Sequence, residues 1–190
     1  MTITTLDPTP ALILIDLQKG IVALPTARPS ADIVKNAAAL ATAARHRGLP
    51  VVLVNVAGGA PGRTERARPS ATPPADWTDL VPEVGTQDND IRITKQRWNA
   101  FSNPALHAAL QERSVTQVIL AGIATSMGIE STARAAHERG YHVLLVTDAM
   151  TDTDSDAHTN SVERIFPKLG ERTSTNELID LLHTAPPAQR

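Results

Sequence analysis

Short runs of aliphatic residues alternate with longer helix-like segments along the chain, and this alternation constrains the fold more than any other feature. Runs that are almost continuously Leu, Ile or Val are typical of strands covered on both faces. Strands that alternate with helices indicate βαβ units, so the sequence predicts a doubly wound α/β fold with a parallel sheet. The predicted strands are residues 11–16, 51–56, 91–95, 117–121 and 142–147, with a short sixth strand near 171–173.

The segments between these strands carry residues that begin and end helices. Ser30 is predicted to be the N-cap of a helix that reaches Arg47, and Gly48 is placed to end it in the left-handed conformation. Asn103 and Pro104 are typical of an N-cap and a first helical residue. Further helices are predicted over residues 128–139, 155–169 and 176–183.

Length and charge exclude several functional classes. With 190 residues, 42% of them hydrophobic, the chain can bury one core, so residues 1–190 are predicted to form a single domain. The net charge of −2 argues against a nucleic-acid partner, and we interpret Arg63, Arg66 and Arg68 as part of a solvated loop. The apolar run at 11–15 is too short to span a membrane and follows no basic segment, so a cytoplasmic protein is expected.

Three unusual positions follow predicted strands. Asp16 closes the first strand, Lys95 closes the third, and residues 122–128 link the fourth to its helix. Ligands of open parallel sheets bind beyond the carboxyl ends of the strands, where a carboxylate and an ammonium would set each other's charge state. Taken alone, Asp16 is equally explained as a loop cap, and Lys95 is better explained by a surface salt bridge. Their joint placement favours a functional site.

Three sequence blocks at these strand ends carry a resemblance. They are LILIDLQ at 12–18, TKQRWNAF at 94–101 and GIATSMGIESTA at 122–133. In this order and spacing they resemble the signature blocks of the isochorismatase-like hydrolase superfamily, over nearly the whole chain. The resemblance implies a three-layer αβα, Rossmann-like architecture with a six-stranded parallel sheet. It also implies a homodimer or a higher homo-oligomer that acts on a small-molecule substrate.

The resemblance assigns roles to individual residues. Asp16 matches the family's catalytic aspartate, Lys95 its catalytic lysine, and Gly128 the position where amidase members such as nicotinamidases carry a nucleophilic cysteine. It further implies a non-proline cis peptide bond between Ile123 and Ala124, with backbone groups at Ala124 and Gly128 directed at the reacting group. This chain contains no cysteine, so the covalent thioester route is closed.

The missing thiol favours one subtype of the family. Isochorismatases proper also carry glycine at this position and cleave a vinyl ether with the aspartate as the acid. Protonation of the enol carbon gives an oxocarbenium ion that water attacks unaided, provided that desolvation keeps the carboxyl pKa high. We therefore expect a hydrolase of a small polar or anionic metabolite. Two alternatives stay open: Asp16 activates water to attack an imine, amide or ester, or the chain is a non-catalytic binding protein.

Two features set limits on this interpretation. Isochorismatases typically have a tyrosine where this chain has Ala124, so the substrate need not be isochorismate. Nicotinamidases hold a metal with residues after the second strand, whereas residues 55–59 offer no ligands, so neither a metal nor a cofactor is expected. A cluster that superficially resembles a metal site is interpreted as helix capping: Asp152, Asp154, Asp156 and His158.

Further residues near the motifs are candidates for substrate binding. Gln18 is placed to position Asp16 or a water molecule, and Arg97 to clamp a carboxylate. Trp98 and Phe101 either line the pocket or pack in the core. Thr125 and Ser126 are interpreted as residues that form cap or loop hydrogen bonds, because no histidine adjoins them in the sequence.

Overall fold

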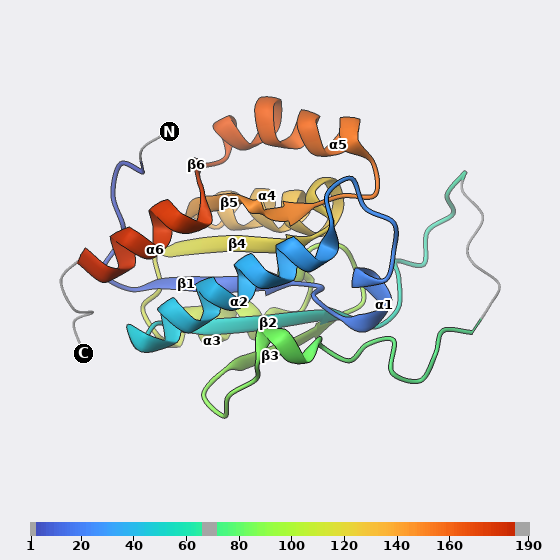
Figure 1. Ribbon diagram of the computed structural model, residues 1–190, viewed down its shortest axis with the longest axis horizontal. Helices are drawn as coiled ribbons and strands as arrows, with labels where there is room; N and C mark the ends of the chain where they lie inside the picture. Colours follow the sequence, from blue (N-terminus) through green and yellow to red (C-terminus); the bar gives the residue numbers. More distant parts are fainter. Residues whose placement is uncertain (1–2, 66–71, 185–190) are drawn as a thin grey trace.

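A parallel sheet forms the middle layer of the molecule (Figure 1). The computed structural model describes residues 3–65 and 72–184. Its six strands run in the order β3-β2-β1-β4-β5-β6, and every neighbouring pair is parallel, as the sequence predicted. The strands are β1 (Pro10–Ile15), β2 (Val51–Val56), β3 (Ile91–Lys95), β4 (Gln117–Ile123), β5 (His142–Thr151) and β6 (Glu171–Thr173).

Helices cover both faces of this sheet. Helices α2 and α6 pack together on one face, and α3 and α4 lie on the other (Figure 1). The helices are α1 (Lys19–Val22), α2 (Ser30–His46), α3 (Pro104–Glu112), α4 (Glu130–Glu138), α5 (Ser155–Asn160) and α6 (Thr175–Thr184). Shorter turns are η1 (Pro82–Val84), η2 (Ala100–Ser102), η3 (Thr125–Ile129), η4 (Ser161–Ile165) and η5 (Phe166–Lys168).

The central strand β1 explains why the aliphatic runs are nearly continuous. All six of its residues are buried. Leu12 and Leu14 join the core beneath α2 and α6, whereas Ile13 and Ile15 join the core beneath α3 and α4. Because successive side chains of a strand point to opposite faces, a sheet covered twice needs an apolar residue at every position.

Most predicted helix ends are confirmed, and two predictions are wrong. Gly48 has a φ of 67°, and the Asn103 side chain accepts a hydrogen bond from the Ala105 N–H at 3.0 Å. Ser30 is not the N-cap of α2: Pro29 holds that position, and the Ser30 hydroxyl donates to the Val22 carbonyl. The helix predicted over 155–169 is instead split into α5, a π-helical turn (η4) and a 3-10 turn (η5) with Pro167.

The loop after β2 extends away from the sheet where the strands end (Figure 1). Arg63 is exposed in this loop, while Arg66 and Arg68, which were assigned to the same solvated segment, lie outside the described residues. Among the helices of the described residues, none has the length and apolar character needed to cross a membrane.

Candidate active site

Asp16 lies where the winding of the sheet reverses direction. Strand β1 has β2 on one side and β4 on the other, and the helices that follow β1 and β4 cover opposite faces. Such a reversal leaves a crevice at the carboxyl ends of the strands. Asp16 follows β1 directly, adopts a φ of 53°, and donates its backbone N–H to the Val54 carbonyl at 2.9 Å. The left-handed backbone turns the chain just after the strand, which aspartate tolerates better than most residues.

A buried ion pair joins Asp16 to Lys95. Lys95 is the last residue of β3, and its Nζ lies 2.7 Å from Asp16 Oδ2, with side chains that are only 1% and 8% exposed. Burial raises the pKa of Asp16 to about 6, an effect that outweighs the opposing charge and hydrogen bond of Lys95. The other carboxylate oxygen, Oδ1, is buried and has no hydrogen-bond partner within the described residues. A buried carboxylate oxygen without a partner is available to a ligand or to a proton.

Gly128 lies against this ion pair from the β4 side. A Cβ at this glycine would be 3.0 Å from Ile15 Cγ2 and 3.4 Å from Asp16 Oδ2. Gly128 belongs to the π-helical turn η3, which follows β4 after a cis peptide bond between Ile123 and Ala124. The cis bond occurs where the resemblance implied it. The backbone of Gly128 therefore forms one wall of the cavity beside the carboxylate.

Side-chain hydrogen bonds to two other segments hold the turn η3 in place. The Asp152 carboxylate accepts hydrogen bonds from the N–H and the hydroxyl of Ser126, at 2.7 and 2.8 Å. The Thr125 hydroxyl lies 2.8 Å from Nδ1 of His158, a residue of α5 that follows 33 positions later, which the sequence did not indicate. Burial, and then the charge of Arg28, lower the pKa of His158. Neither Thr125 nor Ser126 lines the cavity, so their hydrogen bonds support the loop, as predicted.

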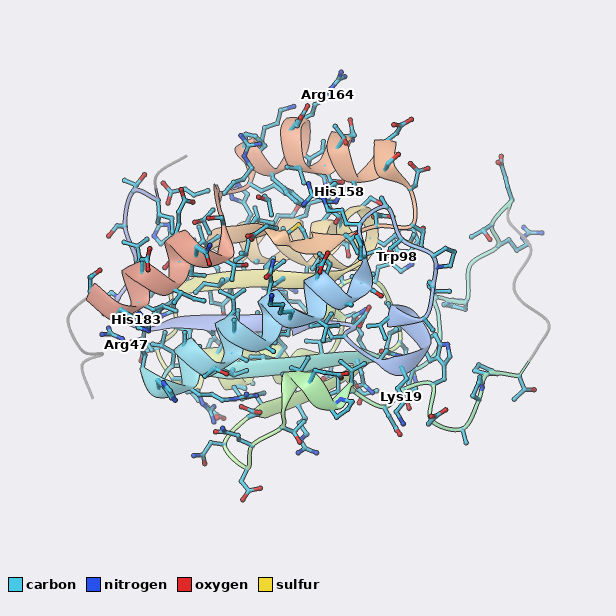
Figure 2. The ribbon with its side chains drawn as sticks, viewed as in Figure 1. Lys19, Arg47, Trp98, His158, Arg164 and His183 are labelled. Atoms are coloured by element: carbon cyan, nitrogen blue, oxygen red, sulfur yellow. The ribbon has the colours of Figure 1, made fainter. Side chains whose placement is uncertain are left out.

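A cavity of about 240 Å³ opens above Asp16 and Lys95. Several residues singled out from the sequence line it together: Asp16, Lys95, Arg97, Trp98, Ile123, Ala124 and Gly128. Trp98 is 62% exposed and lies at the same end of the molecule as α1 and the long loop (Figure 2). The structure thus brings both members of the ion pair and the glycine turn to a single opening.

Two candidate binding residues lie elsewhere. Phe101 is buried in the core, where its ring stacks on Tyr141 at a centroid distance of 5.7 Å and lies beneath the Arg139 guanidinium. This packing corrects the expectation that Phe101 lines the pocket. Gln18 is also fully buried, and its amide bonds to backbone groups of Val56 and Trp77 rather than to Asp16.

Sequence reasoning missed several walls of the cavity. Trp77 comes from the second part of the long loop, residues 72–81, which we call the returning limb. Leu24 follows α1. Ile21, Met127 and Thr153 also line it, as do Val56, Gly58 and Gly59. No local signal in the sequence identifies Trp77, because a pairing between Gln18 and Leu80 across the long loop brings it to the site.

Acidic side chains after β5 accept hydrogen bonds from backbone N–H groups. Asp154 Oδ1 accepts hydrogen bonds from the N–H groups of Asp156 and Ala157, at 2.9 and 3.0 Å, and so caps α5. Across residues 3–65 and 72–184, no three His, Asp or Glu side chains are grouped closely enough to hold a metal ion.

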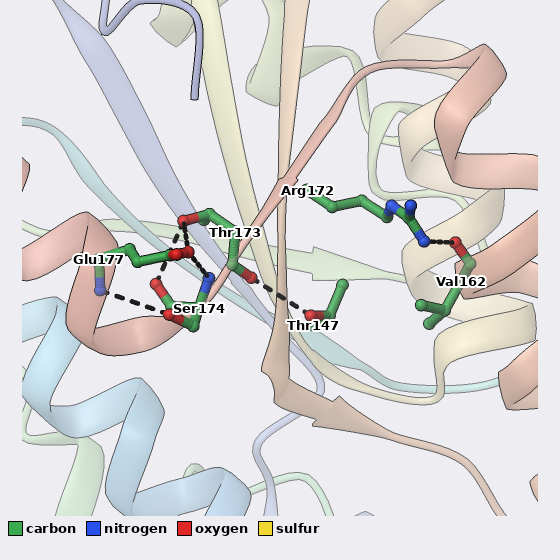
Figure 3. Close-up of a pocket in the computed structure, with 6 residues that line it drawn as sticks. All are labelled: Thr147, Val162, Arg172, Thr173, Ser174 and Glu177. Carbon is green, nitrogen blue, oxygen red and sulfur yellow. Dashed lines mark hydrogen bonds between the residues drawn. The ribbon is translucent and has the colours of Figure 1, made fainter. Parts of the chain in front are cut away.

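A second cavity, of about 300 Å³, lies beside β6 (Figure 3). Its polar groups bond to one another: Glu177 accepts hydrogen bonds from the Ser174 N–H and the Thr173 hydroxyl, and Arg172 donates to the Val162 carbonyl. Because Glu177 caps the start of α6 here, we attribute this arrangement to helix capping.

A family model and several known proteins match this chain. The isochorismatase domain family matches residues 10–177. The uncharacterized isochorismatase family protein YwoC of Bacillus subtilis is 40% identical over 90% of this chain and 92% of its own length. A solved isochorismatase family protein from Burkholderia thailandensis has a TM-score of 0.91 and 38% identity, and covers 96% of this chain and 100% of its own. The ureidoacrylate amidohydrolase RutB of Variovorax paradoxus is 30% identical over 73% of this chain and 67% of its own length.

Proposed function

The chain belongs to the isochorismatase family, whose members are hydrolases, and from this premise we propose that it hydrolyses a small polar or anionic metabolite without a covalent intermediate. Asp16 is the general acid, and Lys95 orients its carboxyl group and stabilises the carboxylate that remains. Backbone at Ala124 and Gly128 contacts the reacting group. The preferred reaction is cleavage of a vinyl ether, because this reaction needs no protein nucleophile and the chain has no thiol.

The chemistry proceeds through an oxocarbenium ion. Asp16 gives a proton to the terminal carbon of the enol ether, and the neighbouring carbon and oxygen share the positive charge that results. Water adds to that carbon and returns a proton to the Asp16 carboxylate. The hemiketal then collapses to a ketone and an alcohol. General acids of this kind contribute about 10²- to 10⁴-fold to a rate.

One observation carries the proposal, which is the state of the Asp16 carboxyl group. Its Oδ1 is buried and has no hydrogen-bond partner among the residues that the structure describes, and burial raises its pKa to about 6, which favours the protonated form at a pH closer to neutral than for an exposed aspartate. With Lys95 bound to Oδ2, the free Oδ1 is the atom from which the proton leaves. Gly128 lines the same cavity as Asp16, so its backbone lies beside the space that a substrate would occupy.

Replacement of the acid tests this role. We expect Asp16→Asn to lower kcat/KM at least about 100-fold for the substrate found in a panel of isochorismate, simple amides and esters. Asp180→Asn, which alters an exposed carboxylate on α6, is the matched control and should leave turnover unchanged. Full turnover by Asp16→Asn would overturn the proposal, and the absence of wild-type turnover across the panel would favour a non-catalytic binding protein.

The sign of the pH dependence separates the acid from the base. An acid role predicts a kcat/KM that falls as pH rises above about 6, because the proton is lost. The alternative, in which the Asp16 carboxylate activates water against an amide, imine or ester, predicts a kcat/KM that falls below that pH. RutB, a relative of this chain, is named as an amidohydrolase, which gives the alternative its support.

A further inference from the structure

We propose that Gln18 is a positioning residue that fixes Trp77 as an aromatic wall of the cavity, against which a flat, unsaturated part of the substrate packs. The inference rests on the proposed function, because it concerns the same cavity and a substrate with a carbon–carbon double bond. It separates two tasks: Asp16 and Lys95 carry the proton transfer, while Gln18 acts through Trp77 on substrate affinity.

The Gln18 amide joins three backbone segments. Gln18 lies two residues after Asp16 and is completely buried. Its Nε2 donates to the carbonyls of Val56 and Trp77, both at 3.1 Å, and its Oε1 accepts the Val56 N–H at 2.7 Å. Both N–H donors are therefore used, and the oxygen bonds to backbone as well. Away from water, the loss of these bonds leaves backbone groups unsatisfied, so the segments are held firmly.

The returning limb of the loop is also paired with the chain just after Asp16. Gln18 and Leu80 form an antiparallel bridge, and the Gly20 N–H donates to the Trp77 carbonyl at 3.0 Å. The limb thus follows the segment between β1 and α1 closely enough to form hydrogen bonds. This pairing keeps Trp77 beside the cavity that Asp16 and Lys95 also line.

Gly20 provides the space for the Trp77 ring. A Cβ at Gly20 would lie 2.0 Å from Cδ1 and 2.1 Å from Nε1 of the indole, so the ring rests directly on the glycine. Gly20 is inside α1 and does not adopt a positive φ, so an alanine there is compatible with the backbone. A side chain at this position would therefore displace the ring while the Gln18 side chain itself is left in the sequence.

The chain offers a direct spectroscopic test, because it contains only two tryptophans and both line this cavity. In a Trp98→Phe background, Trp77 is the sole indole. We expect Gln18→Leu to shift the Trp77 emission to longer wavelength and to increase its quenching by acrylamide. Benzoate, a flat anion that the enzyme cannot hydrolyse, serves as the binding probe, and its Kd should rise about 10-fold. Cyclohexanecarboxylate, its saturated counterpart, should bind more weakly than benzoate and respond less.

Kinetics with the substrate found in the panel complete the test. Gln18→Leu should raise KM about 10-fold with kcat changed less than about 3-fold, because the wall contributes to the ground state and the transition state alike. The midpoint of the pH profile assigned to Asp16 should not move. Gly20→Ala should reproduce the changes in emission, Kd and KM while Gln18 is intact, which covers the case in which Gln18→Leu does not fold.

Lys19→Ala is the matched control, because Lys19 also links α1 to the limb, through exposed ion pairs to Asp76 and Asp79. Such exposed ion pairs contribute little to stability, so the Trp77 emission wavelength should not shift and the Kd for benzoate should stay within about 2-fold. Wild-type emission and Kd in both Gln18→Leu and Gly20→Ala would overturn the inference. So would a lower kcat at unchanged KM, or a wild-type protein that does not bind benzoate. Emission and Kd need no turnover, so a failure of the proposed hydrolysis remains distinguishable.

Discussion

Gly128 lies so close to the ion pair of Asp16 and Lys95 that a Cβ atom at this position would begin to crowd the neighbouring side chains. Its missing side chain leaves Ile15 Cγ2 and Asp16 Oδ2 as the nearest neighbours of the open position. The glycine therefore does two things at the residue scale. It removes the family's thiol, and it lets the backbone approach a carboxylate that burial has made a weaker acid.

A side chain at Gly128 should reduce both stability and activity. In Gly128→Ala, the Cβ must displace Ile15 by a few tenths of an ångström. Crowding of this kind costs about 1–3 kcal/mol, against about 1 kcal/mol gained in helix propensity. We expect the free energy of unfolding in urea to fall by up to about 2 kcal/mol, and kcat/KM to fall as well. Gly59→Ala, a cavity glycine whose Cβ would meet open space, should leave the free energy of unfolding unchanged.

The variant Gly128→Cys distinguishes an enzyme from a non-catalytic binding protein. In Gly128→Cys the thiol would lie beside Asp16 and Lys95. Amide hydrolysis that is absent from the wild type and appears only in this variant would favour a binding protein that has lost its nucleophile. A higher free energy of unfolding in Gly128→Ala than in the wild type would contradict the crowding against Ile15.

At the scale of elements, β4 lies close against the end of β1 at Gly122, which pairs with Ile15. Its φ is 128°, and a Cβ there would be 2.0 Å from the Ile15 carbonyl oxygen. The register between β4 and β5 also shifts between Leu120 and Gly122. Since β1 ends at Ile15 and Asp16 follows, this close approach sets the distance between the Asp16 carboxylate and the turn that holds Gly128.

Two glycine substitutions separate backbone conformation from crowding. Gly140 has a φ of 83° and nothing within 4 Å of its Cβ position, so Gly140→Ala tests the conformation alone and should cost about 1–2 kcal/mol. Gly122→Ala adds the clash with the Ile15 carbonyl and should cost at least about 1 kcal/mol more. Urea unfolding of both variants measures the difference. Equal losses would show that β1 and β4 can separate without cost.

The start of each strand could be predicted from the sequence to within one residue, whereas β4 and β5 end two and four residues later than predicted and some helix ends were misplaced. A strand buried on both faces has an unbroken apolar run, and its start is visible. The start of α2 was misplaced because both Ser30 and Pro29 suit a helix start, and only tertiary structure shows that the Ser30 hydroxyl bonds to Val22. The four-residue helix α1 lacks the length over which a period can be detected.

At the scale of the molecule, the sequence located one part of the candidate site and missed another. Asp16, Lys95 and the turn at Gly128 were expected to meet because parallel strands end at one edge of the sheet, and they do meet. Trp77 was not expected at the cavity, because its position depends on an antiparallel pairing between Gln18 and Leu80 across the long loop. Composition and periodicity carry no information on such a contact.

The raised pKa of Asp16 couples the candidate site to the stability of the whole fold. Its pKa of about 6 in the folded state exceeds the ordinary value of an aspartate, so the folded state binds this proton more tightly than the unfolded state. The carboxyl group therefore stabilises the protein increasingly as pH falls from about 6 to about 4. At neutral pH the ionisation of this buried carboxyl group costs about 3 kcal/mol of folding free energy.

Urea unfolding of the wild type and Asp16→Asn between pH 4 and pH 8 tests this coupling. The free energy of unfolding of the wild type minus that of the variant should rise as pH falls from 7 to 4, by up to about 3 kcal/mol. The change of this difference with pH reports on Asp16, because the other carboxyl groups are the same in both proteins and their contributions cancel. The pH-independent part of the difference also includes the loss of the charged partner of Lys95. A pH-independent difference would mean that the Asp16 pKa is the same in the folded and unfolded states. Asp16 would then hold too little proton near neutral pH to act as the acid.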